Sequence, residues 1–352
     1  MNRKIWLIAD THFGVKGDDE EWLDDYMGYF EDTLIPLMKK EVGEDDILIH
    51  LGDVFDNRSF IGLNTMCRVI RLFEEFSGIF KDIRILVGNH DIFKKSTNDI
   101  TSLNILKHIP NVKIYYTPVV EVIDGKTCLF NPWVENPETE KKILAETNVD
   151  YIFGHLEING SMVANRSGSK INFAGGVENR DFKTSQVYAG HIHIRQENRN
   201  IHYVGNPYHK DRGDRDNDKG ITVLDLKTGE NRFIENKVSP RYVKDSIYDI
   251  LNLTVGDLKT RWKNNRVELH IKSTDITKCN FDGLCSLLNT TYKSFDPVGD
   301  NVVAELNTSG ELGFDDAKSS DEYMSDFLHN QDLTEEMMKE VLDKMNEYRD
   351  RL

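Results

Sequence analysis

The chain has 352 residues, of which 39% are hydrophobic and 30% charged, and its formal net charge is −16 at pH 7. This composition is typical of a soluble globular protein, and no apolar run is long enough for a membrane-spanning helix. The length exceeds what one hydrophobic core usually fills, so we expect a large domain with smaller units. The cysteines form no CxxC pair, which favours reduced thiols in a cytoplasmic protein and disfavours a thiolate metal site; they are Cys67, Cys128, Cys279 and Cys285.

The negative charge is unevenly distributed along the chain. Residues 311–352 contain thirteen Asp and Glu against five Lys and Arg, whereas residues 256–278 contain six basic and three acidic side chains. Because the local field matters more to a charged partner than the total charge, the net charge does not exclude nucleic acid as a partner.

Five short apolar runs each end in a polar cluster. In chain order they are KIWLIADTH with Asp10 and His12, DILIHLGDVFD with Asp53, IRILVGNHD with Asn89 and His90, YIFGH with His155, and VYAGHIH with His191 and His193. Each run has the length and composition of a buried strand. Helical patterns over 21–40 and 63–76 separate the early runs, so the order predicts an α/β protein whose strands are covered by helices.

The five polar clusters are predicted to meet at one place. In α/β sheets ligands bind beyond the carboxyl ends of the strands, where all five clusters fall. His191 and His193 are two residues apart, so they point to one face of an extended segment. A glycine immediately precedes four of the clusters, which permits sharp turns and close packing, at positions 52, 88, 154 and 190.

The side chains in these clusters are those of a metal site. Two aspartates, four histidines and one asparagine amide supply seven oxygen and nitrogen donors, which indicates a pair of divalent ions. The seven are Asp10, His12, Asp53, Asn89, His155, His191 and His193. A Ser or Cys nucleophile is not indicated, because the sequence has no GxSxG motif and no cysteine at these strand ends.

The ordered set DTH, GD, GNHD, GH and GHIH resembles the calcineurin-like metallophosphoesterase superfamily. Within it, DTHFGVKGDDEEW, GDVFDNR, VGNHD, IPNVKIYYTP, GHLEING and YVGNPY are similar to SbcD-type DNA repair nucleases, in particular those of T4-like phages. The resemblance implies a metallophosphoesterase β-sandwich flanked by helices. It also implies a DNA nuclease with double-strand exonuclease and single-strand endonuclease activity, in the host-cell cytoplasm if a phage encodes it.

The resemblance assigns the metal ligands as well. One metal is expected on Asp10, His12 and His193. The other is expected on Asn89, His155 and His191, with Asp53 bridging the two. Two such ions lower the pKa of a shared water and neutralise charge that develops on the phosphate. The resemblance favours manganese, whereas the ligand types alone also permit magnesium, zinc or iron.

Three residues beside the expected ligands have their own predicted roles. His90 is expected to be the general acid or transition-state stabiliser for the leaving oxygen, with an orienting histidine as the alternative. Asp91 is expected to orient His90 through a hydrogen bond. Asp56 stands where cellular SbcD-type nucleases often carry a histidine near the substrate, which leaves its role open.

The chain is predicted to contain a nuclease domain over 1–239, closed by a hairpin over 220–235, and a small α/β capping unit over 240–305. The resemblance implies that the capping unit faces DNA. Candidate DNA contacts are Arg58, Lys259, Arg261, Trp262, Lys263 and Arg266. The alternative for the capping segment is a solvated basic face with a buried tryptophan.

The C-terminal part reads as a linker over 306–319 and two amphipathic helices over 320–352. Such a pair cannot bury its apolar faces alone, and the resemblance implies that it binds an SbcC-type coiled-coil ATPase, in a complex with two nuclease copies. Two other functions remain open: a metallophosphoesterase for small phosphodiesters or phosphoproteins, and a scaffold without metals. The complete ligand set disfavours the scaffold, and the added residues 241–352 disfavour the small-substrate enzyme.

Overall fold

The computed structural model describes residues 3–94, 97–164, 169–183, 185–250 and 252–270, together with a strand at Ser294–Val298. The described residues up to Pro297 belong to one compact unit. The expected linker over 306–319 and helix pair over 320–352 lie outside the described residues, and the expected boundary near residue 240 stays a prediction. Among the described helices none is long and apolar enough to cross a membrane.

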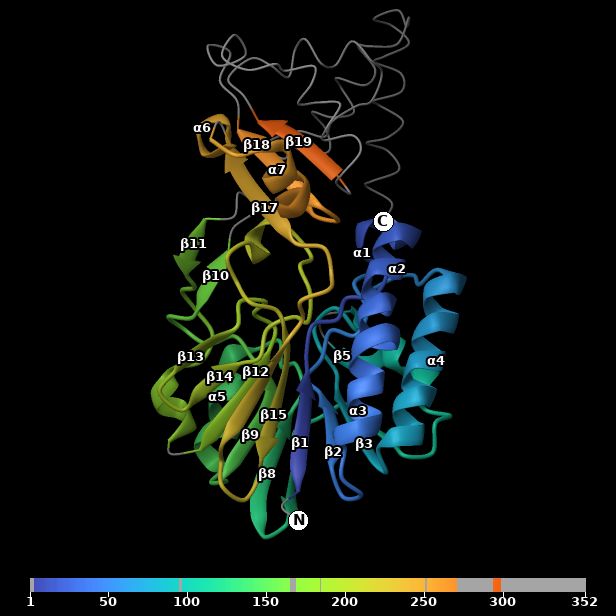
Figure 1. Cartoon of the computed structure of the whole chain (residues 1–352). Helices are drawn as coiled ribbons and strands as arrows, with labels where there is room; N and C mark the ends of the chain where they lie inside the picture. The colour runs from blue at the N-terminus through green and yellow to red at the C-terminus, as the bar shows by residue number, and fades with distance from the viewer. Residues whose placement is uncertain are drawn as a thin grey trace, which may run out of the picture. The chain divides into compact units, whose positions relative to one another are not determined.

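Six strands form the first sheet, in the order β16-β15-β1-β2-β3-β6. Their bounds are β1 Lys4–Ile8, β2 Ile47–His50, β3 Asp82–Leu86, β6 Val112–Tyr115, β15 Gly220–Asp225 and β16 Asn231–Glu235. Figure 1 shows four of them, β15, β1, β2 and β3, side by side. Strands β1, β2, β3 and β6 are parallel, and β15 runs antiparallel to both β1 and β16. The predicted hairpin over 220–235 is therefore confirmed, and it completes one edge of this sheet.

Six further strands form the second sheet, in the order β13-β14-β12-β9-β8-β7. Their bounds are β7 Val119–Ile123, β8 Lys126–Asn131, β9 Tyr151–His155, β12 Gln186–Gly190, β13 Gln196–Asn198 and β14 Ile201–Tyr203. The four central strands are parallel, and an antiparallel strand lies at each edge. All five predicted strands are present, three in the first sheet and two in the second.

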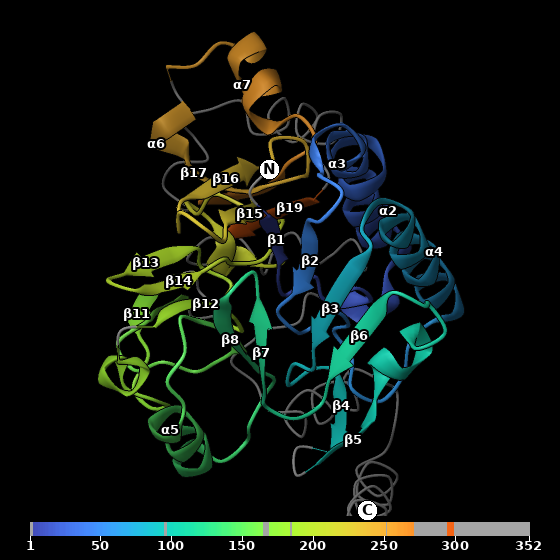
Figure 2. The same ribbon diagram turned by 90° about the horizontal axis from the view of Figure 1, so that it is seen from below.

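The two sheets pack face to face, as the view in Figure 2 shows. Ile5 and Leu7 of β1 belong to the core between the sheets, together with Phe153 of β9. Trp6 and Ile8 belong to the core beneath the helices. Because successive side chains of a strand point to opposite faces, a strand buried on both sides is apolar throughout. Helices therefore cover only the outer face of each sheet.

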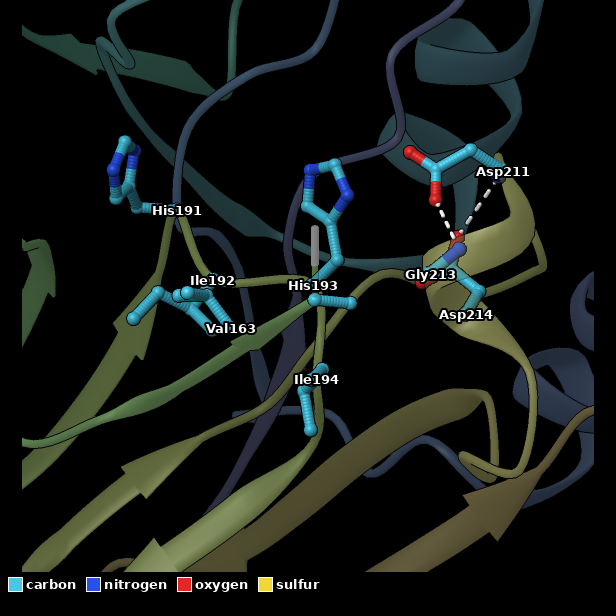
Figure 3. Close-up of a pocket in the computed structure, with 9 residues that line it drawn as sticks. Val163, His191, Ile192, His193, Ile194, Asp211, Gly213 and Asp214 are labelled. Atoms are coloured by element: carbon cyan, nitrogen blue, oxygen red, sulfur yellow. Dashed lines mark hydrogen bonds between the residues drawn. The ribbon is translucent and has the colours of Figure 1, made fainter. Parts of the chain in front are cut away.

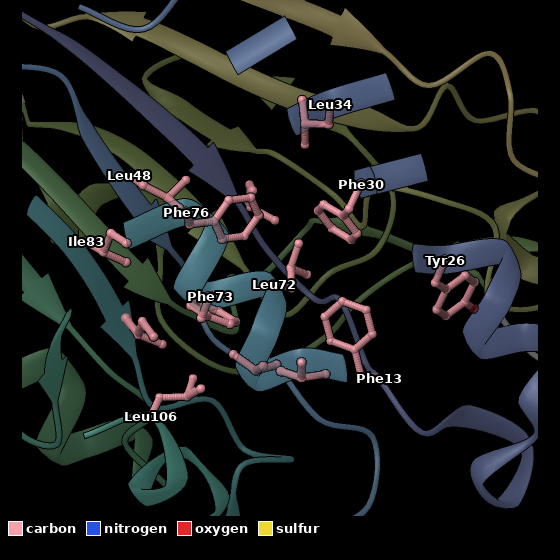
Figure 4. Packing of buried hydrophobic residues seen from close by; sticks show 14 of the residues in the cluster. Phe13, Tyr26, Phe30, Leu34, Leu48, Leu72, Phe73, Phe76, Ile83 and Leu106 are labelled. Carbon is pink, nitrogen blue, oxygen red and sulfur yellow. The ribbon is translucent and has the colours of Figure 1, made fainter. Parts of the chain in front are cut away.

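The helices on the first sheet derive from the two predicted helical patterns. They are α2 Glu20–Tyr29, the π-helical turn η1 Phe30–Leu34, α3 Ile35–Glu41 and α4 Leu63–Ile79. Phe30, Leu72 and Phe76 pack in the core between these helices and the sheet (Figure 4). Pro36 has no N–H to continue the helical hydrogen bonds, and the widened turn lies directly before α3, which contains it.

One helix and several short elements complete this part of the chain. Helix α5 Pro137–Glu146 contributes Leu144 to the core on the outer face of the second sheet. The short elements are α1 Val15–Asp18, β4 Ile92–Lys94, β5 Thr97–Thr101, η2 Ser102–Leu106, β10 Met162–Ala164, β11 Lys170–Asn172, η3 Asn179–Phe182 and η4 Arg212–Asp214.

The capping segment forms its own sheet of three strands, β17 Tyr242–Ser246, β18 Arg266–His270 and β19 Ser294–Val298, with helices α6 Ile247–Ile250 and α7 Val255–Trp262. Trp262 is fully buried, and its indole Nε1 donates to Asp245 at 2.7 Å. The expectation that Trp262 stacks on DNA is therefore wrong, because its ring belongs to the core of this segment. The alternative of a buried tryptophan is confirmed.

Arg266 is also unavailable to DNA, which corrects its prediction. It is 3% exposed, its guanidinium lies 3.6 Å from the centre of the Trp22 ring, and it donates to Asp25 at 2.8 Å. Arg261 is held differently, since its guanidinium donates to both oxygens of Asp245 while half of the side chain stays exposed. Lys259 and Lys263 are exposed, so they remain candidate DNA contacts together with half-buried Arg58.

Candidate metal centre

The seven predicted donors converge where β1, β2, β3, β9 and β12 end. Figure 3 shows two of them, His191 and His193, on the segment that follows β12, with both rings projecting to the same side. Within the first expected ligand group, Nε2 of His12 lies 3.0 Å from Nε2 of His193. The donor atoms of Asp10, His12 and His193 all lie within 4.8 Å of one another.

The second expected group is equally close. The amide oxygen Oδ1 of Asn89 lies 2.9 Å from Nε2 of His155 and 2.9 Å from Nδ1 of His191. Asp53 lies between the two groups, because its Oδ2 is 3.7 Å from Nε2 of His12 and 3.5 Å from Nε2 of His155. The position of this carboxylate is the one that a bridging ligand needs.

Two of the four histidines make a hydrogen bond on the side that faces away from the centre, and a third, His12, has a carboxylate nearby without hydrogen-bond geometry. Nδ1 of His155 donates to the carbonyl of Leu51 at 2.8 Å. Nδ1 of His12 lies 3.2 Å from Oδ1 of Asp56, and Nε2 of His191 lies 3.1 Å from Oε1 of Glu157. Such contacts assign the proton of a neutral imidazole to its outward nitrogen, so the inward nitrogen carries a lone pair.

These lone pairs are the reason the centre fits cations. The inward nitrogens of His155 and His191 both face the oxygen of Asn89, which is an acceptor itself. Acceptors that face one another at this distance repel unless a positive charge or added protons lie between them. Imidazole, carboxylate and amide groups suit a divalent metal, and each of the seven donor side chains is one of these types.

The pKa values of the donors agree with a centre that needs positive charge. Burial acts against the charge of His155, but Asp53 outweighs it and raises the pKa of His155 to about 9, so without a metal this imidazole takes up a proton. Burial raises the pKa of Asp10 to about 7. Burial also acts against the charge of Asp53, but the charge and hydrogen bond of His155 outweigh it and hold the pKa of Asp53 well below its usual range. Burial, together with the charge of Lys210, lowers the pKa of His12 to about 4, which keeps this imidazole neutral and able to bind a metal.

The backbone is strained at several of the donors. Among the described residues with positive φ are Asp10 at 53°, His12 at 43°, Asp53 at 56° and His191 at 87°. Side chains other than glycine disfavour this region, and such strain gathers at functional sites.

Two of the predicted glycines allow the close approach of the loops. A Cβ on Gly88 would lie 2.2 Å from Oδ1 of Asp53, and one on Gly52, whose φ is 98°, would lie 2.5 Å from Nδ1 of His155. Any side chain at either position would therefore displace an expected ligand.

His90 lies beside the first group of donors. Its ring centre is 4.8 Å from that of His12, and its main-chain N–H donates to Oδ1 of Asp53 at 2.7 Å. Nδ1 of His90 is held by the carbonyl of Asp56 at 2.6 Å. Nε2 is therefore the ring atom that can give or take a proton.

Asp91 does not orient His90, which corrects the prediction. Its carboxylate instead accepts hydrogen bonds of 2.8 to 3.2 Å from four main-chain N–H groups, those of Asp53, Val54, Phe55 and Gly88. The side chain is buried and joins the loop after β2 to the loop after β3. Its role is to hold the two loops that carry Asp53 and Asn89.

Several residues around the centre were not singled out from the sequence. Glu157 contacts His191, and Lys219 donates to the carbonyl of His193 at 2.8 Å and pairs with buried Asp214. Lys210 pairs with Asp56 at 2.8 Å. The only signal for Glu157 is its position two residues after His155, which places both on one face of an extended segment.

A pocket of about 160 Å³ adjoins His191 and His193. Apolar side chains such as Val163 and Ile194 line one side of it, and the segment with Asp211 and Asp214 lines the other (Figure 3). The pocket thus lies directly beside two of the expected ligands.

Comparison with known proteins agrees with this geometry. Residues 3–195 match the calcineurin-like phosphoesterase family, a span that is more than half of the chain and contains all seven donors. The chain belongs to this family. It is therefore a phosphoesterase with the metallophosphoesterase fold, and the family's use of divalent metals agrees with the clusters of donors.

Three individual proteins are similar to this member of the family. Exonuclease subunit 1 of Enterobacteria phage T4 is 30% identical over 275 residues, which covers 74% of this chain and 78% of the phage protein. A protein of unknown function from Aquifex aeolicus, AQ665, has a TM-score of 0.29 and 22% identity over 47% of this chain and 82% of its own. A 5'-nucleotidase precursor from Thermus thermophilus has a TM-score of 0.31 and 13% identity over 68% of this chain and 56% of its own.

Proposed function

We propose that this phosphoesterase is a DNA nuclease that uses two divalent metal ions. The observation that carries the proposal is the convergence of seven donors into two groups that share Asp53, whose Oδ2 lies 3.7 Å from His12 and 3.5 Å from His155. DNA as the substrate is supported by the identity of 30% with a phage protein named as an exonuclease subunit. Double-strand exonuclease and single-strand endonuclease activity are proposed on the same ground.

The residues of the centre have distinct tasks in this proposal. Asp10, His12 and His193 would hold one ion and Asn89, His155 and His191 the other, with Asp53 available to both. When bound, a pair of divalent ions lowers the pKa of a water molecule and neutralises charge on the phosphate oxygens. Manganese is the proposed metal and magnesium the alternative.

His90 is proposed to carry the proton that the leaving oxygen needs. The carbonyl of Asp56 holds its Nδ1 at 2.6 Å, so Nε2 is the atom that transfers the proton. The ring is half-buried beside His12, where a substrate bound at the centre can reach it.

DNA binding and partners are proposed from the sequence and its resemblance. Exposed Lys259 and Lys263 of the capping segment are proposed to contact the phosphate backbone, together with Arg58. Residues 320–352 are proposed to bind a coiled-coil ATPase of the SbcC type, in a complex with two copies of the nuclease. The amphipathic pattern of those residues supports an interaction surface of this kind.

The test compares substrates and one variant. The purified chain with Mn²⁺ is expected to cleave labelled linear duplex and hairpin DNA, measured beside a small chromogenic phosphodiester. The variant Asp53→Asn is expected to lose cleavage and to bind less manganese by elemental analysis, because it removes the charge shared by both ions. Cleavage of the small ester alone would favour an enzyme for small phosphodiesters, and unchanged activity of the variant would refute the assigned centre.

A further inference from the structure

Two carboxylates outside the seven donors each contact the outward nitrogen of one donor histidine. Oδ1 of Asp56 lies 3.2 Å from Nδ1 of His12, and Oε1 of Glu157 lies 3.1 Å from Nε2 of His191. His12 belongs to the first donor group and His191 to the second. Each expected metal position therefore has one acidic residue behind one of its histidines.

Asp56 is held firmly in this position. Its main-chain N–H donates to the carbonyl of Phe13 at 3.0 Å, which aligns the loop after β2 with the loop that carries His12. Its carboxylate also pairs with Lys210 at 2.8 Å. The main-chain bond to Phe13 and the ion pair with Lys210 thus hold Asp56 beside the imidazole of His12.

Glu157 lies in a comparable arrangement on the second group. Its main-chain carbonyl accepts from the N–H of Val177 at 2.9 Å, which fixes the segment after β9. The ring of Trp133 lies against His191, with the two ring centres 5.2 Å apart. Glu157 and Trp133 thus both contact the His191 ring.

We infer that Asp56 and Glu157 are positioning residues, one for each of the two metal positions. Glu157 accepts the outward N–H of His191, and the negative charge of Asp56 lies 3.2 Å from the outward nitrogen of His12 without hydrogen-bond geometry. Each carboxylate thereby favours a proton on the outward nitrogen, so that the lone pair of the other nitrogen is directed at the centre. This inference rests on the two-metal centre of the proposed function. Loss of such an outer contact typically lowers metal affinity about 10- to 100-fold.

The structure allows the two positions to be addressed separately. His155 has a main-chain carbonyl as its outward partner, which no side-chain substitution removes. Substitution of Asp56 likewise leaves its own main-chain carbonyl in place, so His90 keeps its contact at 2.6 Å. Changes in metal affinity are therefore separable from changes in proton transfer.

The experiment measures manganese binding to the full chain by isothermal titration calorimetry. Asp56→Ala is expected to weaken one of the two binding steps about 10- to 100-fold, and Glu157→Ala the other. The loss from Asp56→Ala is expected to vanish when His12→Ala is already present, and the loss from Glu157→Ala when His191→Ala is present. Glu138→Ala, which removes an exposed carboxylate of α5, is the matched control and is expected to change neither step.

Conservative variants separate positioning from folding. Asp56→Asn and Glu157→Gln keep an acceptor oxygen, so each is expected to show a smaller loss at the same single step. If thermal melts show that the alanine variants are unfolded, Asp56→Asn and Glu157→Gln take their place. The inference then requires that these two variants weaken different binding steps. Equal weakening of both steps by either residue, or a loss that persists in the histidine backgrounds, would overturn the inference.

The same titration distinguishes this inference from the proposed function. A wild-type chain that binds fewer than two manganese ions overturns the inference, because it requires two positions. A wild-type chain that binds two ions but cleaves only a small phosphodiester overturns the DNA assignment alone. In that case the step-specific losses of Asp56→Ala and Glu157→Ala would still support the positioning roles.

Discussion

At the scale of single residues, His90 and Asp91 are neighbours in sequence with separate tasks. Main-chain groups and Asp53 hold His90, whereas Asp91 accepts hydrogen bonds only from main-chain N–H groups in the contacts that the structure describes for its carboxylate. Among the described contacts, the ring of His90 has one hydrogen bond, to the carbonyl of Asp56, so the frame of the centre depends mainly on other residues. Removal of the ring tests chemistry rather than folding.

His90→Ala is expected to keep both metals and its affinity for DNA while losing about a hundred- to ten-thousand-fold in turnover, the usual contribution of a general acid. The main-chain N–H that contacts Asp53 is unchanged by this substitution. Single-turnover kinetics on labelled DNA, combined with elemental analysis, check both parts. A fall in metal content that parallels the fall in activity would make His90 a ligand or a support.

At the scale of elements, α5 and β8 enclose a buried carboxyl group. Glu140 of α5 is 4% exposed, and Nδ2 of Asn131 in β8 donates to it at 2.9 Å. Burial raises the pKa of Glu140 from 4.5 to about 8. The folded protein therefore favours the neutral acid, and the contribution of this group to stability is full below pH 4.5 and is lost as pH rises through 8.

Glu140→Gln is expected to remove this dependence on pH, because the amide stays neutral and still offers an oxygen to Asn131. The unfolding free energy of the variant minus that of the wild type is therefore expected to increase from about pH 5 to about pH 9. Urea unfolding at these two pH values measures the gain, with exposed Glu138→Gln in the same helix as the control. If the difference in unfolding free energy between variant and wild type is the same at both pH values, the raised pKa of Glu140 is contradicted.

At the scale of the whole molecule, residues 320–352 supply the second test of function. Their deletion is expected to leave manganese-dependent cleavage of a small phosphodiester intact and to abolish co-purification with a coiled-coil ATPase of the SbcC type. The acidic character of this part of the chain disfavours direct DNA binding, because like charges repel the phosphate backbone.

Pull-down of the co-expressed ATPase by full-length and truncated chains measures this prediction. The small ester controls for a correctly folded catalytic part. A truncated chain that still retains the ATPase would move the proposed interface to another surface, and a truncated chain that unfolds would make these residues part of the folded core.

The fold class and the convergence of the seven donors could be predicted from the order of the residues alone. Short apolar runs specify buried strands, and the polar cluster at the end of each run lies where strands of an α/β fold end together. The glycines at 52 and 88 predict that two loops approach each other closely. The structure confirms this, because a Cβ at Gly52 would lie 2.5 Å from His155 and one at Gly88 would lie 2.2 Å from Asp53. The apolar runs, the polar clusters and the glycines each occupy a short stretch of sequence, so they can be recognised without the structure.

The side chains that support the donors could be identified only from the folded arrangement of the chain. Asp56 and His12 are 44 positions apart, and Glu157 and His191 are 34 apart, so no local pattern pairs them. The sequence likewise does not show that part of the basic stretch around Trp262 is buried, so this stretch was predicted to be a DNA-binding surface. The ring of Trp262 is buried against Asp245, and Arg266 pairs with Asp25 from a distant helix. Burial and pairing of this kind depend on the packing of segments far apart in the chain, which composition and spacing do not encode.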